Sequence, residues 1–227
     1  MAESGVTEPA AYRITPAVMI IDMQNGFVTD GGSFSKIGYD ISRYQKVIPA
    51  IQELHHEAKA LGIPVLFSRA LREQSGIDML ERQHQILPEK RRERIERMPL
   101  CVRGTWDSEI IDKLKPEPDD LIVDKRRDSA FQDTEFALWL RSMKIDTVVF
   151  AGVDTSICVE SSLRDAFNRG WDVILLSDAT ASLNNVFYET TLAEVGDNFG
   201  LVMTSHELFC NLRPLGNGRF LLGPPEM

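Results

Sequence analysis

Six short runs of apolar residues divide the 227-residue chain, and segments with helical spacing lie between them. Runs of this kind, without alternation of apolar and polar residues, are typical of strands buried on both faces of a parallel sheet. Parallel strands need crossover connections, which the helical segments can supply. The sequence therefore predicts an α/β fold built on one doubly wound, mostly parallel sheet. The runs are Ala17–Ile21, Pro64–Ser68, Leu121–Val123, Thr147–Ala151, Val173–Leu176 and Leu201–Thr204.

The first helical segment begins at Tyr44 and ends near Leu61. Its apolar residues recur at the three- and four-residue spacing of one helical face, and Gly62 and Pro64 then mark its end. The same kind of pattern predicts three more helices in the second half of the chain. They span Glu135–Met143, Cys158–Arg169 and Thr190–Phe199.

Composition and charge argue against several classes of protein. The chain is 43% hydrophobic and 26% charged, which is ordinary for a soluble globular protein. Its formal net charge of −9 predicts repulsion from phosphate backbones and anionic lipids, so we expect neither nucleic acid nor membrane as a partner. No apolar run approaches the roughly 18 residues of a membrane span, and Met1–Tyr12 lacks the pattern of a secretion signal. Three widely spaced cysteines suggest no disulfide framework, which favours the cytoplasm.

Two segments stand apart from the strand and helix pattern. Glu89–Arg97 holds five basic and three acidic side chains, which indicates either a solvated charged face or a cationic rim that helps to capture an acidic substrate. Residues 212–227 are rich in Gly and Pro and form a non-helical tail after a single domain at residues 1–211. Phe220–Leu222 give this tail apolar side chains to bury, and packing on a neighbouring subunit of a homo-oligomer would bury them.

Three reactive side chains follow three different apolar runs. Asp22 comes directly after the first run, Lys125 follows the third, and Cys158 lies six residues beyond the glycine that ends the fourth. Ligands of open α/β sheets bind beyond the carboxyl ends of the strands, where these three residues are expected. A carboxylate can accept a thiol proton, and an ammonium group favours the thiolate. The three residues therefore form a candidate nucleophilic site.

Each of the three residues also has an interpretation without catalysis. An isolated cysteine is most often a small buried apolar residue, an aspartate after a strand caps a turn, and a lysine lies on the surface. Cys158, however, falls in the first turn of a predicted helix, where unpaired N–H groups and the helix dipole would lower the pKa of its thiol and hold an oxyanion. Cys101 and Cys210 have no such setting, and we treat both as structural or incidental.

Three segments of the chain resemble the isochorismatase-like cysteine hydrolases. They are VMIIDMQNGF at residues 18–27, DKRRDSAFQDTEF at residues 124–136 and VVFAGVDTSICVESSLRDAFNRGWDVILLSDATAS at residues 148–182. The resemblance implies a Rossmann-like fold with six parallel strands in the order 3-2-1-4-5-6 and helices on both faces. It also implies a Cys–Asp–Lys triad, which falls here on Cys158, Asp22 and Lys125. A cis peptide bond at Val153–Asp154 and an oxyanion hole formed by the amides of Asp154 and Cys158 belong to the same resemblance.

Departures from the family pattern narrow the predicted chemistry. Family members that act on a vinyl ether lack a cysteine nucleophile, so Cys158 favours hydrolysis of a C–N bond. Nicotinamidases resemble this chain but carry metal-binding histidines after the second strand, where SRALREQSG has none. We therefore expect no metal and no other cofactor. The four histidines, which lack metal-ligand spacing, are His55, His56, His84 and His206.

Among the cysteine members, the chain looks most similar to ureidoacrylate and related N-carbamoyl amidohydrolases. The similarity lies in MQNGFVTDGGSFSKIGYDIS, which begins at Met23, and in GTWDSEIIDKLKP, which begins at Gly104. Biuret and N-carbamoylsarcosine hydrolases share much of this framework. Arg69 also stands where an asparagine is expected in a ureidoacrylate pocket, so the substrate stays open between these classes.

The predicted function is that of a metal-independent cysteine amidohydrolase that cleaves a C–N bond of a small carbamoyl, ureido or amide compound through a thioester. We expect Gln24, Phe27, Arg69 and Phe131 to line the substrate pocket. Arg69 either holds a substrate carboxylate or pairs with Glu73 on the surface. The partners would be a small-molecule substrate and further copies of the chain in a dimer or tetramer. A non-catalytic α/β protein that binds a partner, and a redox sensor that uses the Cys158 thiol, are the alternatives from other classes.

Overall fold

The central sheet has the topology that the sequence predicts. In the computed structural model, which describes residues 11–78, 86–89, 91–93 and 100–223, six strands pair in the order β4-β3-β2-β5-β6-β7, and all pairs are parallel. Counted along the chain within this sheet, the order is the expected 3-2-1-4-5-6. The strands are β2 (Pro16–Ile21), β3 (Val65–Ala70), β4 (Leu121–Lys125), β5 (Thr147–Val153), β6 (Asp172–Ala181) and β7 (Leu201–Met203).

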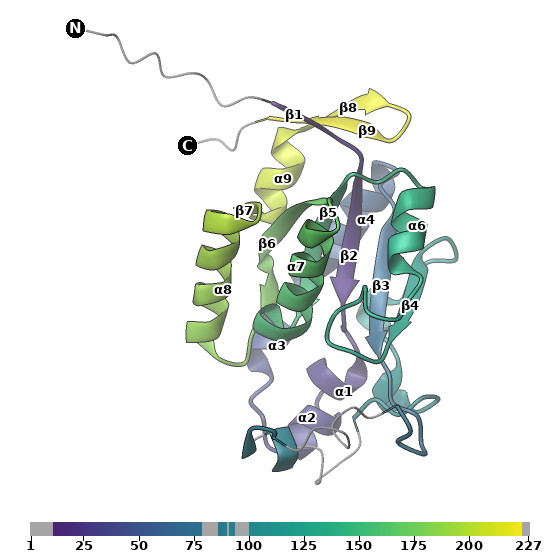
Figure 1. Ribbon diagram of the computed structural model, residues 1–227, viewed down its shortest axis with the longest axis vertical. Helices are drawn as coiled ribbons and strands as arrows, with labels where there is room; N and C mark the ends of the chain where they lie inside the picture. Colours follow the sequence, from purple (N-terminus) through teal and green to yellow (C-terminus); the bar gives the residue numbers. More distant parts are fainter. Residues whose placement is uncertain (1–10, 79–85, 90, 94–99, 224–227) are drawn as a thin grey trace, which may run out of the picture.

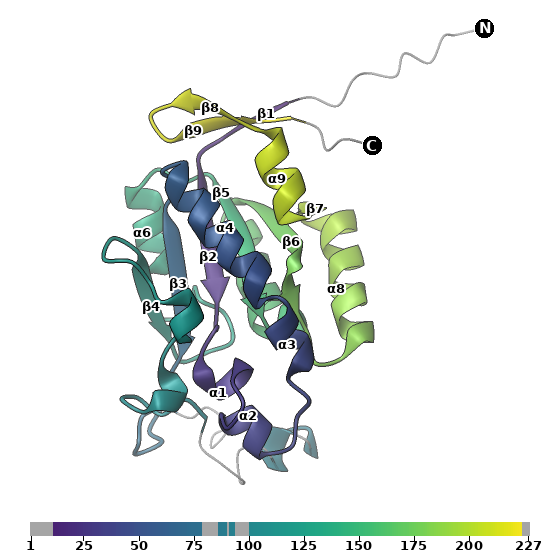
Figure 2. The same ribbon diagram turned by 180° about the vertical axis from the view of Figure 1, so that it is seen from behind.

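Helices cover both faces of the sheet, which Figures 1 and 2 show from opposite sides. One face carries α6 (Phe136–Ser142), α7 (Glu160–Asn168) and α8 (Asn185–Asn198). The other face carries α4 (Ile48–Ala60), preceded by α3 (Ser42–Lys46), and α9 (Ser205–Asn211). Two short helices, α1 (Asn25–Val28) and α2 (Ser33–Lys36), lie beyond the carboxyl end of β2. This arrangement confirms the predicted doubly wound α/β fold.

The predicted helices differ from the observed ones where a local signal interrupts or extends the pattern. The segment from Tyr44 to Leu61 forms two helices, because Pro49 at the start of α4 has no N–H to continue the hydrogen bonding of α3. Helix α8 begins five residues earlier than predicted, since the side chain of Asn184 caps it by accepting a hydrogen bond from the Val186 amide at 2.9 Å.

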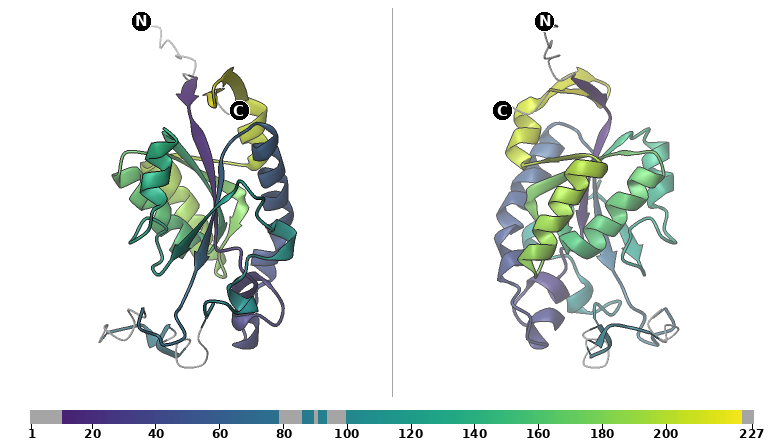
Figure 3. Two further views of the ribbon diagram at one scale, coloured as in Figure 1. Left: turned by 90° about the vertical axis from the view of Figure 1, so that its right-hand side faces the viewer. Right: turned by 60° about the vertical axis from the view of Figure 1, so that its left-hand side comes forward.

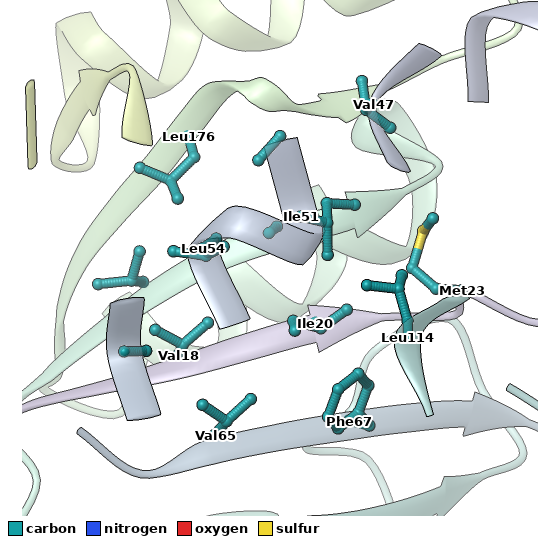
Figure 4. Close-up of a cluster of buried hydrophobic side chains, with 14 of the residues drawn as sticks. Val18, Ile20, Met23, Val47, Ile51, Leu54, Val65, Phe67, Leu114 and Leu176 are labelled. Atoms are coloured by element: carbon teal, nitrogen blue, oxygen red, sulfur yellow. The ribbon is translucent and has the colours of Figure 1, made fainter. Parts of the chain in front are cut away.

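Two hydrophobic clusters hold the helices on the sheet, one on each face. Figure 4 shows part of the first, in which Ile51 and Leu54 of α4 point onto Val18 and Phe67 of the sheet. The second cluster joins α6, α7 and α8 to the opposite face. Alternate residues of each strand point to opposite faces, and helices cover both faces, so every residue of β2 and β5 is buried. This burial on both faces explains the continuous apolar runs.

A second, smaller sheet was not predicted. It contains β1 (Tyr12–Ile14), β8 (Leu212–Gly216) and β9 (Arg219–Leu222) in the antiparallel order β1-β9-β8. The β8–β9 hairpin turns at Asn217 and Gly218, which both have positive φ, as a type I′ turn requires. Phe220 and Leu222 are buried in the main cluster of their own chain, so burying them requires no neighbouring subunit. The non-helical segment predicted from residue 212 is thus a β-hairpin, and its packing on a neighbouring subunit stays a prediction.

The ends of the molecule carry different features. Figure 3 shows the helical layers on either side of the large sheet, with the small sheet at one end and the described residues of the connection after β3 at the other, beyond the carboxyl ends of the strands. Of the charged segment Glu89–Arg97, residues 90 and 94–97 lie outside the described residues, while residues 89 and 91–93 are helical. Arg91 Nη1 lies 3.6 Å from Asp128 Oδ2, three residues beyond Lys125.

Within the described part of the chain, no helix is long and apolar enough to cross a membrane.

Candidate active site

Asp22 and Lys125 form a buried ion pair at the carboxyl ends of β2 and β4. Lys125 Nζ lies 2.7 Å from Asp22 Oδ2, and the side chains are only 0% and 2% exposed. The strand between them is β3, where the residue in register with Lys125 is the small Ala70. A long side chain on β4 can therefore reach across β3 to the end of β2. Asp22 itself adopts φ of 52°, a left-handed conformation that aspartate tolerates and that redirects the chain as it leaves the strand.

Ser68 of β3 holds the other oxygen of the same carboxylate. Its hydroxyl donates to Asp22 Oδ1 at 2.6 Å and accepts a hydrogen bond from the Asp22 amide at 3.2 Å. Ser68 is fully buried, so these hydrogen bonds are shielded from water. The carboxylate is thus held on one oxygen by a hydroxyl and on the other by an ammonium.

Cys158 lies in a π-helical turn, Thr155–Val159, between β5 and α7. Such turns are rare and are frequent at functional sites. Burial raises the pKa of the Cys158 thiol above its usual range; Lys125 opposes this, and the charges of Asp22 and Asp128 and a hydrogen bond to Asp22 raise the pKa further. The sequence-based expectation of a lowered pKa is therefore wrong, because burial and carboxylates outweigh the helix terminus. The resting site contains a thiol rather than a thiolate.

Lys125 keeps its charge in this setting. Burial alone would lower its pKa, but the charge of the Asp22 carboxylate and its hydrogen bond act in the opposite direction, and the net pKa lies above the ordinary lysine value. The Nζ atom also donates to the backbone oxygen of Arg127 at 3.2 Å. The site thus presents a carboxylate beside a fixed cation and a neutral thiol, which suits general-base activation of the sulfur.

The carboxylate of Asp154 fastens the turn that carries Cys158. It accepts five hydrogen bonds, which come from the start of the turn, from the segment after β6 and from α3. The donors are Ser156 N at 2.9 Å, Ser156 Oγ at 2.7 Å, Ser182 Oγ at 2.7 Å, Tyr44 Oη at 2.7 Å and Leu183 N at 3.2 Å. The sequence analysis predicted a role only for the Asp154 amide. That the Asp154 side chain holds the turn in place is an additional finding.

The end of β5 approaches β2 closely just before this turn. Gly152 has φ of 110°, and a Cβ atom there would lie 2.1 Å from the backbone oxygen of Ile21. Only glycine fits this conformation and this contact. The peptide bond between Val153 and Asp154 is cis, as the family resemblance implied. Both features lie beside the triad, because Ile21 directly precedes Asp22.

Two of the four predicted pocket residues lie directly after β2. Gln24 is buried, and its amide donates to the backbone oxygens of Ala70 and Ser108 and accepts from the Ala70 amide, so its side chain fastens the segment after β2 to β3. Phe27 lies on α1, partly buried, with its ring 4.9 Å from that of Phe34. The role of Phe27 as a pocket wall stays a prediction. The hydrogen bonds of the Gln24 side chain give it a structural role.

Arg69 is engaged by carboxylates of its own chain. Its Nε and Nη2 lie 2.9 and 2.8 Å from Asp124 Oδ1, and its Nη1 lies 3.7 Å from Glu109 Oε2. Strand alternation also directs it to the sheet face opposite Ser68 and Lys125. The predicted surface pair with Glu73 is absent as well, since Glu73 pairs with arginines 103 and 126. The structure therefore supports neither expectation for Arg69.

Phe131 belongs to the second hydrophobic cluster rather than to a pocket. Its ring lies 4.6 Å from Phe136 and 5.5 Å from Trp171. Trp171 directly precedes β6 and so lies at the amino end of that strand, away from the triad. The expectation that Phe131 lines the pocket is corrected, because its ring packs in the core beneath the loop after β4.

Sequence reasoning missed three residues that support the site. Ser68 carried a signal, because it is a polar residue at the end of an apolar run predicted to be a buried strand. Tyr44 and Ser182, which donate hydrogen bonds to Asp154, carried no such signal in the sequence. Tyr44 lies 110 residues from Asp154, and Ser182 lies just beyond the end of β6. Among the described residues, no three His, Cys, Asp or Glu side chains gather as metal ligands.

Comparisons with known proteins agree with this geometry. The model of the isochorismatase domain matches residues 16–207. Ureidoacrylate amidohydrolase RutB of Agrobacterium fabrum is 33% identical over 204 residues, which cover 86% of this chain and 89% of that protein. The corresponding protein of Serratia proteamaculans is 35% identical over 218 residues, with coverage of 89% and 86%.

Solved structures show the same similarity. An isochorismatase-like hydrolase from Alkaliphilus metalliredigens superposes with a TM-score of 0.71 at 30% identity, covering 86% of this chain and 97% of that one. A cysteine hydrolase from Pseudomonas syringae pv. phaseolicola superposes with a TM-score of 0.75 at 27% identity, covering 86% and 91%. Sequence, fold and relatives agree, and the chain belongs to the isochorismatase family of hydrolases.

Proposed function

We propose that this protein is a metal-independent cysteine amidohydrolase that cleaves a C–N bond of a small carbamoyl, ureido or amide compound. The observation that carries the proposal is the buried Asp22–Lys125 pair beside the Cys158 thiol. The similar proteins named ureidoacrylate amidohydrolase favour a ureidoacrylate-like substrate. This preference rests on those relatives and not on Arg69, whose guanidinium is already paired.

In the first half of the reaction, Asp22 takes the proton of the Cys158 thiol as the sulfur attacks the substrate carbonyl. A new C–S bond forms, and the carbonyl oxygen becomes an oxyanion. The amides of Asp154 and Cys158 would hold that oxyanion, with each donor contributing about 3 kcal/mol in comparable acyl-transfer sites. The tetrahedral intermediate collapses as the C–N bond breaks. Protonated Asp22 then returns its proton to the departing nitrogen.

In the second half, a water molecule attacks the thioester carbonyl while Asp22 accepts a proton from it. The C–S bond breaks, and the sulfur is protonated again. A ureido substrate would yield ammonia directly or by way of carbamate. Lys125 stays charged throughout and stabilises Asp22 in its ionised form, which is consistent with a raised lysine pKa.

A substrate panel tests the proposal. Release of ammonia is measured with ureidoacrylate and other ureido acids, biuret, N-carbamoylsarcosine, maleamate and simple amides, and we expect turnover of at least one ureido or carbamoyl compound. Cys158→Ala and Cys158→Ser should each lose more than about 99% of the activity, whereas Cys210→Ala, which alters an exposed cysteine on α9, should retain it.

Several outcomes would contradict the proposal. Retention of more than about one hundredth of the activity in either Cys158 variant would exclude a covalent mechanism. Peroxide-sensitive oxidation of Cys158 without any turnover would favour a redox sensor instead, and inertness of the thiol would favour a non-catalytic protein. Selective turnover of biuret or N-carbamoylsarcosine would replace the ureidoacrylate-like substrate within the same mechanism. The cytoplasmic location and the homo-oligomeric state stay predictions.

A further inference from the structure

Ser68 is a fully buried polar residue beside the triad that the mechanism above does not use. It comes from β3, the strand between those that supply Asp22 and Lys125. The side chains of its strand neighbours Leu66 and Phe67 are buried and apolar. The hydroxyl therefore has no contact with solvent. Both of its hydrogen bonds are made with one residue, Asp22.

The two hydrogen bonds restrain both the backbone amide and the carboxylate of Asp22. The Ser68 hydroxyl accepts from the Asp22 amide at 3.2 Å and donates to Oδ1 of the same residue at 2.6 Å. Rotation of the carboxylate would break the shorter bond, which is charge-assisted and shielded from water. Oδ1 is therefore held by Ser68. Oδ2 lies 2.7 Å from Lys125 Nζ and receives no hydrogen bond from the serine.

This division between the two oxygens has a chemical consequence. A base that takes a proton from a thiol needs a lone pair directed at it. Oδ1 accepts from Ser68, whereas Oδ2 lies beside the Lys125 ammonium but accepts no hydrogen bond from the described residues, so Oδ2 is the oxygen with a lone pair available for the proton of Cys158. A hydrogen bond donated to a carboxylate also favours its ionised form, which is the form that acts as the base.

We propose that Ser68 is a positioning residue that holds Oδ1 of Asp22 and thereby directs proton transfer from Cys158 to Oδ2. The proposal rests on the proposed function of the triad and deepens it. The other ionisable groups near this carboxylate are Lys125 on β4, Cys158 in the π-helical turn, Asp128 after β4 and Cys101 at the end of the connection after β3. None of them replaces the Ser68 hydroxyl as a donor to Oδ1.

A matched control exists in the same chain. Ser205 at the start of α9 donates its hydroxyl to Asp178 Oδ2 at 2.6 Å, and its amide donates to Asp178 Oδ1 at 2.8 Å. This pair has the same chemistry and the same short distance as Ser68 and Asp22, but it fastens α9 to β6. Ser205→Ala thus removes a serine–aspartate hydrogen bond without touching the triad.

The experiment compares the pH profiles of kcat and kcat/KM for the wild type and for Ser68→Ala, Ser68→Thr and Ser205→Ala, with the substrate that the panel identifies. In Ser68→Ala we expect the acid limb of kcat/KM to move up by about one pH unit. We also expect kcat at neutral pH to fall by about tenfold or more, with KM within about twofold. Ser68→Thr keeps the donor and should restore the acid limb, and Ser205→Ala should match the wild type.

Two results would overturn the inference. One is an unshifted acid limb in folded Ser68→Ala, and the other is an equal shift in Ser205→Ala. If Ser68→Ala does not fold, Ser68→Cys takes its place, because a thiol is a weaker donor and should also move the acid limb upward relative to Ser68→Thr. Absence of turnover in the wild type would refute the proposed function instead, so the two failures are distinguishable.

Discussion

Replacing Lys125 with methionine keeps an unbranched side chain, one atom shorter, and removes its charge. The lysine lies 2.7 Å from Asp22 Oδ2, and both side chains are almost completely buried. The substitution therefore leaves a carboxylate in the interior without its cation. Breaking a buried ion pair by removing one partner costs about 3–5 kcal/mol in free energy of unfolding. For a chain of this length, that corresponds to a fall in Tm of about 6–20 °C.

A double-mutant cycle measures how much of that cost comes from the pair. We expect Asp22→Asn to destabilise the protein to a similar extent, because it leaves the buried Lys125 cation unpaired. The combination of Asp22→Asn with Lys125→Met removes both charges, while the carbonyl oxygen of the introduced amide can still accept from the Ser68 hydroxyl. The double variant should therefore be more stable than the sum of the single effects predicts, with a coupling energy of about 2 kcal/mol.

Urea denaturation followed by circular dichroism supplies the free energies, and ammonia release supplies the activities. Arg164→Met is the control, since Arg164 Nη2 lies 2.7 Å from Glu160 Oε1 in a partly exposed pair on α7 and removal of such a pair costs at most about 1 kcal/mol. All three variants of the Asp22–Lys125 pair should be inactive, and Arg164→Met should be fully active. Additive effects in the cycle, or a cost in Lys125→Met no larger than in Arg164→Met, would refute the reasoning.

Three further outcomes are expected. Arg69→Ala should change kcat/KM by less than about twofold, and equally for acidic and neutral substrates, because Asp124 already holds the guanidinium; a loss confined to acidic ureido compounds would return Arg69 to the pocket. Phe220→Ala should cost about 3–5 kcal/mol in urea denaturation, because the ring is 3% exposed in the main hydrophobic cluster; an effect that depends on protein concentration would indicate packing between subunits instead. Turnover should survive exhaustive dialysis against EDTA, and activity that is lost and then restored by zinc would contradict the metal-independent mechanism.

The sequence predicted those parts of the fold that depend on local periodicity. Each of the six apolar runs became a strand of the large sheet. The pattern is clearest in β2 and β5, because strands buried on both faces leave no polar position to obscure it. The order of the strands came from the family resemblance and was confirmed. The small sheet was missed, since β1 has only three residues and its partner lies at the far end of the chain. The Asn217–Gly218 pair was the one local signal for it.

The candidate site was predictable in its reactive groups and not in their surroundings. Asp22 and Cys158 follow strands, Lys125 is the last residue of one, and the topology brings the ends of these strands together. The pKa of Cys158 could not be read in the same way, because it depends on the burial of the sulfur and on carboxylates from other segments. The partner of Arg69 could not be predicted from the sequence either. Its place after an apolar run predicts that it lies at the carboxyl edge of the sheet, but only the register of β3 with β4 places Asp124 beside it.

The small sheet also affects when the protein can finish folding. Its β1–β9 ladder joins Tyr12 to Leu222, residues that are 210 positions apart. During translation at about 5–20 residues per second, β1 therefore waits about ten to forty seconds for its partner. Over that interval the apolar side chain of Ile14, which is buried in the finished molecule, has no strand to cover it. Contacts between residues so distant in sequence form slowly, so we expect these strands to pair later than the neighbouring strands of the large sheet.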